Sequence, residues 1–513
     1  MSLLKTVSTV GGWTLAYRVS SFVRDMAQSR ILGAGLYADV FSLAFKFANI
    51  LRKLFAEGAF NASFLPIFSN TLKDKSKEEA EKLASQVFTW LTLMVAFLML
   101  VCLIFFREII HGYAPGIDVS SEKFEHLVSI GRICSPYIAA SFLAALFGGI
   151  LNTLNRFAMP AGAQLILNIG VIIALFIGAL WFPSAAYTMA WATFIAGAIQ
   201  VIILWINTEY CGIHVGINFQ PMMEEVKVFF KKLISGAIGA GVWQLNVIID
   251  FGILSFLPTG AVSYFYYTDH MNQFPIGILG IAFSTALLPP ITRAIHDKNF
   301  KAAQVQMNSG LLFAFMFALP AAAILICLSE ELTGAIYGGG NFGPEQVMAA
   351  APALVAFALG LPAYMATKVF TTVFFASKDT KTPLNGGIIS ILSNLLFIVL
   401  LMPMMKHTGV ALATTLSAWC NAIYLVANIH KLGAVKINAH LVKECCKQFF
   451  MLALMLVSLF LMNPIAQPHY LNGGMEKGIA VSVVMLISIG VFFIVGKMMN
   501  AFSFTDDIMK SDQ

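Results

Sequence analysis

Long apolar runs decide what this chain can fold into. Each run holds about twenty predominantly apolar residues, the length that an α-helix needs to cross the hydrocarbon core of a bilayer. Inside that core every backbone polar group must be satisfied within a helix or a closed barrel, so such runs predict helical spans. The sequence therefore predicts an all-α polytopic membrane protein with about 14 transmembrane helices. The predicted spans lie near residues 7–30, 37–66, 84–106, 127–152, 159–181, 185–207, 230–256, 261–290, 306–329, 347–375, 383–403, 408–430, 446–463 and 478–499.

The composition excludes a soluble globular protein. Of the 513 residues, 58% are hydrophobic and only 11% are charged, whereas roughly 25% are charged in an average soluble domain. The formal net charge of +6 comes from basic residues spread between the apolar runs, which is typical of membrane topology signals. We therefore expect no nucleic-acid partner. The seven cysteines form no CxxC pair, so the sequence supports neither a zinc site nor a disulfide framework.

Lysine and arginine residues indicate the orientation of the chain. An even number of spans places both termini on the same side of the membrane. With the termini in the cytoplasm, roughly 20 Lys and Arg residues lie in cytoplasmic segments and about 5 lie outside, as the positive-inside rule requires. We therefore expect a multi-pass membrane protein with both termini in the cytoplasm.

The sequence also contains an internal repeat. At an offset of 223 residues, Asn49 aligns with Asn272 and Pro66 aligns with Pro289. The offset divides the first twelve spans into two sets of six with parallel topology, related by a pseudo-symmetry axis along the membrane normal. The predicted parts are an N-terminal lobe (1–223), a C-terminal lobe (224–445), and a segment with two further helices and a cytoplasmic tail (446–513).

Charged residues inside the predicted spans mark a candidate site. A charge at the bilayer centre costs about 2.5–3.5 kcal/mol on insertion scales, so such residues are functional candidates by default. Arg18, Ser21 and Asp25 lie at i, i+3 and i+7 on one face of the first predicted helix, and Arg24 widens that polar face. The other candidates from these spans are Asp39, Arg52, Glu57, Asp269, His270 and Lys368.

Two interpretations of these charges stay open. The ions can neutralise one another as structural contacts, and for Asp39 and Glu57 this interpretation and a functional one are evenly balanced. The basic residues outnumber the nearby acids, however, and a buried cation is costly unless an anion pairs with it. Arginine has a planar fork that binds phosphate in a bidentate manner. The arginines therefore predict a ligand that carries phosphate or pyrophosphate.

Asp250 is a lone carboxylate in an apolar run. Asn246 precedes it by four residues, which is one helical turn. Asp250 is either a protonated, hydrogen-bonded residue or an oxygen ligand of a cation, together with Asn246 and a polar group of a later helix such as Asn394.

The segment YRVSSFVRDMAQSRILGAGLYADVFSLAFKFANILRKLFAEGAFNASFLPIF (Tyr17–Phe68) closely resembles the N-terminal signature of the MurJ (MviN) family. These proteins are lipid II flippases of bacterial peptidoglycan synthesis and belong to the multidrug/oligosaccharidyl-lipid/polysaccharide (MOP) exporter superfamily. The likeness continues through LNTLNRFAMPA, YTDHMNQFPIGILGIAFSTALLP and FFASKDTKTP, so it covers essentially the whole chain.

The resemblance implies a transporter rather than an enzyme. It implies two six-helix lobes around a central cavity, with the last two helices forming a groove for a long lipid tail. The expected substrate is lipid II, the undecaprenyl-pyrophosphate-linked peptidoglycan precursor, which would move from the cytoplasmic to the periplasmic leaflet by alternating access. We expect a monomer that works beside cell-wall synthases.

The resemblance also assigns roles to residues. Arginines at the positions of Arg18, Arg24 and Arg52 hold the pyrophosphate in the family, with Asp25, Asp39 and Glu57 beside them. Lys368 matches a basic residue of helix ten. Asp250 stands where relatives carry the carboxylate of a sodium site, so Na⁺ or H⁺ is left open as the coupling ion, and no other cofactor is expected.

Two positions depart from the family pattern. Ala48 replaces a proline before Asn49, which should stiffen the bend of the second helix. His270 stands after Asp269 where many relatives carry an arginine. Histidine changes its charge near neutral pH, so the second lobe would anchor the anion more weakly or in a proton-sensitive way.

Two other functions are compatible with parts of the sequence. Another exporter of the MOP superfamily, for a polysaccharide-lipid intermediate or a drug, remains the alternative. A drug antiporter for cations would favour an acidic cavity, whereas the first lobe is rich in arginine. An enzyme acting on polyprenyl phosphates would place its carboxylates in interfacial loops, and the outer loops at 182–186 and 257–261 are too short to hold them.

Overall fold

The computed structural model describes residues 3–54, 59–178, 184–286, 288–297, 299–429, 439–471 and 474–502. Within these ranges the regular elements are helices, apart from one isolated β-bridge between Gly339 and Phe342. The predicted all-α fold is therefore confirmed. The chain divides into two compact units, Met1–Ser263 and Tyr264–Gln513.

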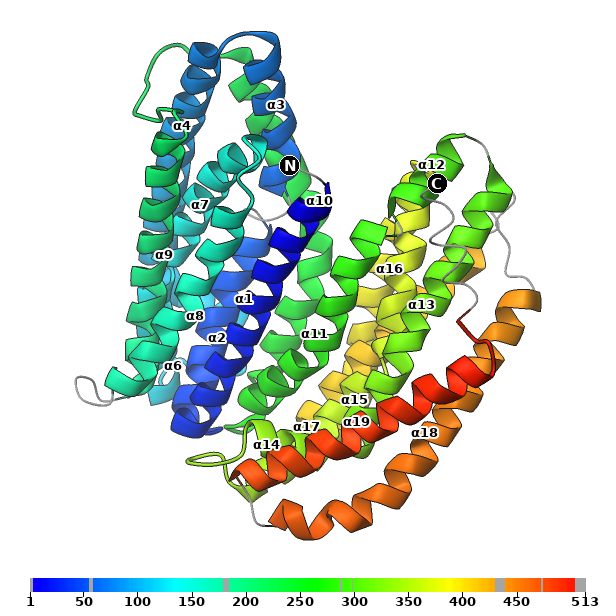
Figure 1. Cartoon of the computed structure of the whole chain (residues 1–513). Helices are drawn as coiled ribbons and strands as arrows, with labels where there is room; N and C mark the ends of the chain where they lie inside the picture. Colours follow the sequence, from blue (N-terminus) through cyan, green and yellow to red (C-terminus); the bar gives the residue numbers. More distant parts are fainter. Residues whose placement is uncertain are drawn as a thin grey trace. The chain divides into compact units, whose positions relative to one another are not determined.

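The first unit is a helical bundle in which α8 packs along both α1 and α9 (Figure 1). Serine side chains begin several of its helices. The hydroxyl of Ser76 accepts from the amide of Glu79 at the start of α4, and Ser121 caps α6 in the same way. The helices of this unit are α1 (Leu3–Leu32), α2 (Leu36–Arg52), α3 (Phe60–Asp74), α4 (Lys77–Ile104), α5 (Phe106–Tyr113), α6 (Glu122–Cys134), α7 (Pro136–Thr153), α8 (Ala158–Gly178), α9 (Ala185–Tyr210) and α10 (Glu224–Leu254).

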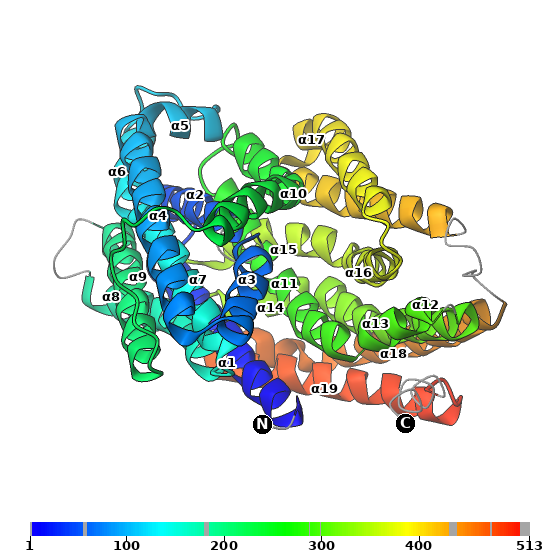
Figure 2. The same cartoon turned by 90° about the horizontal axis from the view of Figure 1, so that it is seen from above.

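The second unit ends in two long helices, α18 and α19, that lie side by side (Figure 2). Its longest element, α17, is interrupted at Lys406, whose φ of 52° is not helical. Pro403 just before this point has no amide hydrogen to donate to the helix. The helices are α11 (Ala261–Ala286, beginning in the last residues of the first unit), α12 (Leu288–His296), α13 (Phe300–Cys327), α14 (Ser329–Ile336), α15 (Pro344–Ala358), α16 (Leu361–Ala376), α17 (Lys381–Asn428), α18 (Ala439–Leu471) and α19 (Gly474–Met498).

The internal repeat predicted from the sequence is also found in the first and last residues of the helices. The bounds of α13 differ from those of α4 by 223 residues at both ends, and the same holds for α14 and α5. The division by packing falls after Ser263 rather than after residue 223, because α10 packs against α2, α3 and α4. The lobe boundaries at 223 and 445 therefore remain predictions.

Nine candidate membrane spans are found among the described residues. Their lipid-facing character shows in large exposed apolar side chains such as Phe97, Phe176, Val399 and Phe460. The helices α1, α2, α3 and α11 do not qualify as candidates, and α10 contributes only the shorter apolar stretch Gln244–Leu254. Most of the in-span charges singled out in the sequence lie on these helices. The number of 14 spans is therefore not confirmed.

Candidate functional site

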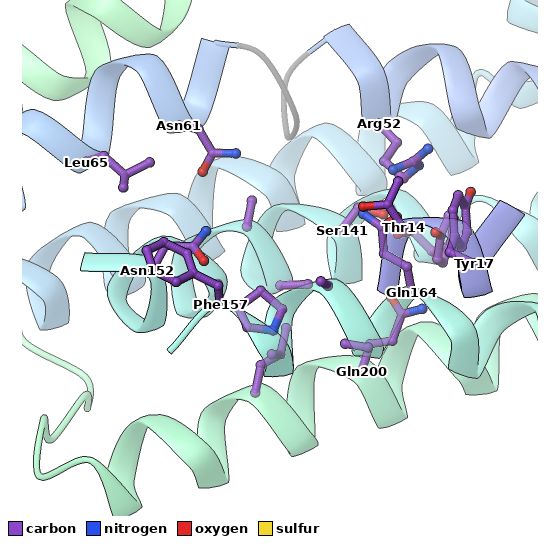
Figure 3. A pocket seen from close by; sticks show the side chains of 18 residues that line it. Thr14, Tyr17, Arg52, Asn61, Leu65, Ser141, Asn152, Phe157, Gln164 and Gln200 are labelled. Carbon is purple, nitrogen blue, oxygen red and sulfur yellow. Dashed lines mark hydrogen bonds between the residues drawn. The ribbon is translucent and has the colours of Figure 1, made fainter. Parts of the chain in front are cut away.

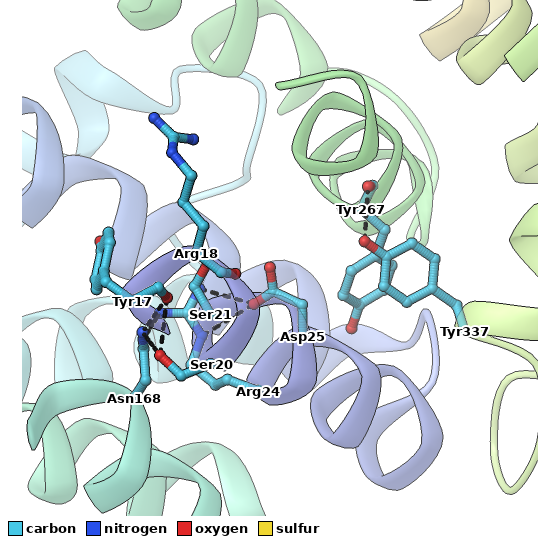
Figure 4. A network of polar contacts seen from close by, with 9 residues as sticks. All are labelled: Tyr17, Arg18, Ser20, Ser21, Arg24, Asp25, Asn168, Tyr267 and Tyr337. Carbon is cyan, nitrogen blue, oxygen red and sulfur yellow. Dashed lines mark hydrogen bonds and ion pairs between the residues drawn. The ribbon is translucent and has the colours of Figure 1, made fainter. Parts of the chain in front are cut away.

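Arg24 is the centre of a buried polar network on α1. Its Nε and Nη2 donate to Asp25 Oδ1 at 2.9 and 2.7 Å, and its Nη1 donates to Asn168 Oδ1 of α8 at 3.0 Å. The guanidinium also lies over the ring of Phe45 at 5.0 Å from its centroid. Arg24 is 3% exposed and Asp25 is 0% exposed. The network therefore holds a charged pair deep inside the first unit (Figure 4).

Asn168 joins this network to the preceding turn of α1. Its Nδ2 donates to the carbonyl of Tyr17 at 3.2 Å and to the hydroxyl of Ser20 at 2.8 Å. An amide side chain is well suited to this place because it accepts from Arg24 and donates to two oxygens at once. The network fixes both the rotamer of Arg24 and the packing of α1 on α8.

Arg18 lies on the same helix in a different environment. Its side chain is half-buried and extends away from the Arg24–Asp25 pair (Figure 4). Within the described ranges its Nε is buried and has no hydrogen-bond partner. Arginine has five N–H donors and cannot be deprotonated, so this side chain retains capacity to bind an anion.

Asp39 does not pair with the arginines. Its Oδ2 accepts from Lys123 Nζ and from the amide of Gly260, each at 2.9 Å. Its Oδ1 accepts from the amide of Ser263 at 2.9 Å and from the hydroxyl of Ser263 at 2.7 Å. The carboxylate is 0% exposed. It joins α2 to α6 and to the start of α11, which is a structural arrangement.

Arg52 ends α2 and lines a cavity inside the first unit. Its Nε donates to Asn49 Oδ1 at 3.1 Å, which is one turn earlier in the helix. The cavity measures about 460 Å³ and is lined by residues of α1, α2, α3, α7, α8 and α9 (Figure 3). Glu57, expected beside Arg52, lies outside the described residues.

Asp250 is 4% exposed on α10, with Asn246 one turn before it. A buried carboxylate with a nearby amide oxygen fits the ligands that hard cations prefer. Asn394, buried on α17, belongs to the second unit. No cluster of three or more His, Cys, Asp or Glu that could hold a metal is found in the described parts of the chain. The predicted cation site consists of one carboxylate and two amides, which is not a cluster of that kind. It therefore stays a prediction.

The remaining candidates lie in the second unit. Both carboxylate oxygens of Asp269 accept from Gln273 Nε2, at 2.9 and 3.0 Å. The ring of His270 stacks on Tyr266 with a centroid distance of 5.9 Å. Lys368 is exposed on α16.

Aromatic packing stabilises the helix that carries Asp269 and His270. The hydroxyl of Tyr337 donates to the carbonyl of Tyr267 at 3.1 Å, and the two rings are in contact (Figure 4). Both side chains are fully buried. This contact ties α11 to the segment after α14, so it holds α11 in place within the second unit.

The candidate site also contains residues that were not predicted from the sequence. Asn168 and Gln200 are polar residues inside apolar runs, a signal that is visible in the sequence. Lys123, the partner of Asp39, lies in a charged stretch that gives no sign of its role.

Comparison with known proteins extends along nearly the whole chain. A family described as lipid II flippase MurJ matches residues 28–481. A probable lipid II flippase MurJ of Rhizobium tropici is 34% identical over 441 residues, which cover 84% of this chain and 82% of the relative. The probable lipid II flippase MurJ of Rickettsia prowazekii is 33% identical over 498 residues, which cover 96% of this chain and 97% of the relative.

Solved structures show the same likeness. A lipid II flippase MurJ in an inward closed conformation matches with a TM-score of 0.79 and 25% identity, over 96% of this chain and 98% of that chain. An inward-facing multidrug resistance MATE transporter of the MOP superfamily matches with a TM-score of 0.67 and 14% identity, over 82% and 98%. At that identity the second likeness concerns the fold alone.

Proposed function

Because the chain belongs to the lipid II flippase MurJ family, we propose that it translocates lipid II from the cytoplasmic to the periplasmic leaflet of the bacterial inner membrane. The observation that carries this proposal is the family match over residues 28–481. Membership in a flippase family makes the protein a transporter of its lipid, and we expect it to leave the lipid chemically unchanged.

Arg18 is the residue that first binds the pyrophosphate. It is half-buried and its Nε has no hydrogen-bond partner among the described residues, whereas Arg24 already donates to Asp25 and Asn168. A pyrophosphate reaching Arg24 must therefore compete with the carboxylate of Asp25. Such an exchange lets the substrate loosen α1 from α8 only when it is bound, and it couples anion binding to a change in helix packing.

The lipid tail stays in the membrane along the last two helices. A largely apolar groove of about 570 Å³ is lined by Cys327 of α13 and by residues of α18 that include Leu456, Phe460 and Pro464. An apolar groove shields a polyprenyl chain from water without a specific polar contact. The headgroup then crosses by alternating access of the two lobes while the tail remains in lipid.

The energy for returning the carrier to its starting conformation comes from the membrane potential or from an ion gradient across the membrane. Na⁺ or H⁺ at Asp250 and Asn246 would supply charge compensation near α10. The protein acts as a monomer, with both termini in the cytoplasm and with cell-wall synthases as the consumers of its product.

Depletion of the protein in its native cell tests the proposal. We expect lipid II to accumulate and to stay inaccessible to an impermeant label or to a lipid II-cleaving toxin added outside. Accumulation of a different polyprenyl-linked sugar, with normal access to lipid II, would instead assign the chain to another exporter function of the MOP superfamily.

A matched pair of variants then locates the anion site. We expect Arg18→Gln to fail to restore growth in the depleted cell, because it removes the cation that first binds the pyrophosphate. Arg293→Gln removes an exposed cation on α12, which belongs to the second unit, and should restore growth fully. Normal growth of both variants would contradict the role of Arg18.

A further inference from the structure

The segment between α9 and α10, residues 211–223, is bound along one side of α4 (Figure 1). We call this segment the strap. Three alternate amides of the strap donate to three side chains of α4 that are spaced one turn apart. Four strap residues therefore span two helical turns, about 11 Å, so the strap is extended. The three hydrogen bonds join His214 to Glu81 at 3.2 Å, Gly216 to Ser85 at 3.2 Å and Asn218 to Thr89 at 2.8 Å.

Gln86 of α4 fixes the end of the strap that leads into α10. Its Nε2 donates to the carbonyls of Gln220 and Pro221 at 3.3 and 3.0 Å. Its Oε1 accepts from the amide of Met223 at 2.9 Å. The Gln86 side chain is fully buried. Backbone groups along most of the strap are therefore paired with side chains of a single helix.

The part of α4 that holds the strap belongs to a candidate membrane span, Lys77–Ile104. The charged residues of this helix end at Lys82, and residues 83–104 carry no charge. That uncharged stretch is about 33 Å long, slightly more than the hydrocarbon core of roughly 30 Å. Thr89 lies about 9 Å inside the stretch, so the tip of the strap at Asn218 reaches the edge of the hydrocarbon core. Irregular backbone at that depth has to find its hydrogen-bond partners in the protein, as the strap does.

The strap exposes large apolar side chains at its tip. Ile213 and Val215 are buried in the first unit, whereas Ile217 and Phe219, on either side of Asn218, are 74% and 67% exposed. No Asp, Glu, Lys or Arg occurs in residues 211–223, so the strap offers little to a charged partner. Exposed apolar side chains also lead into the strap from the cytoplasmic half of α9: Ile202, Trp205, Ile206 and Tyr210.

We propose that the tip of the strap is a lipid-binding surface, on which Ile217 and Phe219 insert between the acyl chains of the cytoplasmic leaflet. The transfer of such side chains from water to hydrocarbon is favourable without any specific contact. The lipid then holds the strap on α4. Because the strap is the covalent connection between α9 and α10, this anchor also limits the movement of the first turn of α10. The inference does not depend on which lipid the protein transports.

Two labelling reagents test this surface in the unmodified full-length protein in nanodiscs. A carbene precursor dissolved in the hydrocarbon labels residues that contact acyl chains, whereas hydroxyl radicals oxidise residues that contact water. Mass spectrometry of peptides then locates both labels. We expect Phe219 to be labelled by the carbene as strongly as Phe176, an exposed residue of the candidate span α8, and to be protected from oxidation. His296 on α12, whose side chain is 87% exposed, should show the opposite pattern.

Two results of this experiment would overturn the proposal. Oxidation of Phe219 at the level of His296, without carbene label, would place the tip of the strap in water as a docking surface for a soluble protein. Carbene labelling of Phe219 that requires anionic phosphatidylglycerol, and is absent in neutral phosphatidylcholine, would assign the contact to headgroup charge rather than to acyl chains. We expect equal labelling in the two lipids.

Hydrogen exchange then tests whether the lipid holds the strap on α4. In Ile217→Asp/Phe219→Asp, the amides of Gly216 and Asn218 should exchange about tenfold faster, because aspartate is unfavourable in hydrocarbon. Ile217→Leu/Phe219→Leu keeps the tip apolar and should keep the protection. Gln220→Asp adds a charge at an exposed polar residue of the same strap and should also keep it. Unchanged exchange in the aspartate variant, or an equal loss of protection in the leucine variant, contradicts the lipid anchor. If the aspartate variant fails to fold by thermal unfolding, Phe219→Ser provides the same readout.

Discussion

The structural and the functional interpretation of the buried charges predict different results for variants of the Arg24–Asp25 pair. Removing one member of a buried ion pair leaves an uncompensated charge, whereas replacing both with apolar residues is often neutral. We expect Asp25→Ala to lower the free energy of unfolding by about 3–5 kcal/mol, measured by unfolding in detergent. The double variant Arg24→Met/Asp25→Leu should recover most of this loss and still fail to restore growth in the depleted cell. Growth of the double variant would mean that the pair is only structural.

The sequence could place Arg24 and Asp25 on one face of a helix but could not choose their partners. Asn168, which accepts from Arg24, lies 144 residues away, and periodicity carries no information about contacts at that separation. Asp39 shows the same limit more strongly. Its donors include Lys123 and two backbone amides, and a backbone amide has no sequence signature at all.

Among the helices, the repeat and the apolar runs were predictable because both are properties of the sequence itself. The subdivision of the runs was less so. The run at 127–152 is divided into α6 and α7 at Pro136, which occupies the first turn of α7. The run at 347–375 is divided in the same way, with Pro362 in the first turn of α16. Proline is tolerated in the first turn of a helix and kinks or breaks a helix interior, and hydropathy alone does not show where such a division falls.

An ion pair at the surface ties the end of α3 to the start of α10. Lys75 Nζ donates to Glu225 Oε1 at 2.6 Å. This hydrogen bond lowers the pKa of the Glu225 carboxyl and raises the pKa of Lys75. Because the pKa of Glu225 is lowered, its ion pair stabilises the folded state at pH values above the unfolded-state pKa. This stabilisation is lost as the pH falls through the folded-state pKa. Because the pKa of Lys75 is raised, the stabilisation that Lys75 provides is lost only as the pH rises through its folded-state pKa.

We therefore expect the Lys75–Glu225 ion pair to be present at neutral pH and to be lost in acid. Hydrogen exchange of the amides at 224–228, corrected for the intrinsic rate, should show less protection at low pH than at neutral pH. Glu225→Gln should exchange at the acid level at both pH values. A pH response that survives in Glu225→Gln would assign the effect to another group.

In the whole molecule, the 223-residue offset predicted from the sequence is found again in the bounds of α4 and α13. The grouping of α10 with the first unit could not be foreseen in this way. A repeat shows which helices are equivalent, whereas packing depends on contacts such as those of α10 with α2 and α3. A sequence repeat therefore predicts which helices correspond to each other, but it does not predict which helices pack together.

The charge of the substrate sets the response of transport to the membrane potential. Moving one elementary charge across 100 mV is worth about 2.3 kcal/mol, and outward movement of an anion is favourable when the interior is negative. We expect an inside-negative potential to accelerate outward translocation of lipid II in proteoliposomes, and an inside-positive potential to slow it. Imposing the potentials with K⁺ gradients and valinomycin in Na⁺-free buffer at constant pH keeps the candidate coupling ions fixed. If the rate does not depend on the potential under these conditions, the charge of the pyrophosphate is compensated during the crossing by a cation other than Na⁺. A proton carried by Asp250 is then the explanation to test, and Asp250→Asn should restore the dependence on the potential.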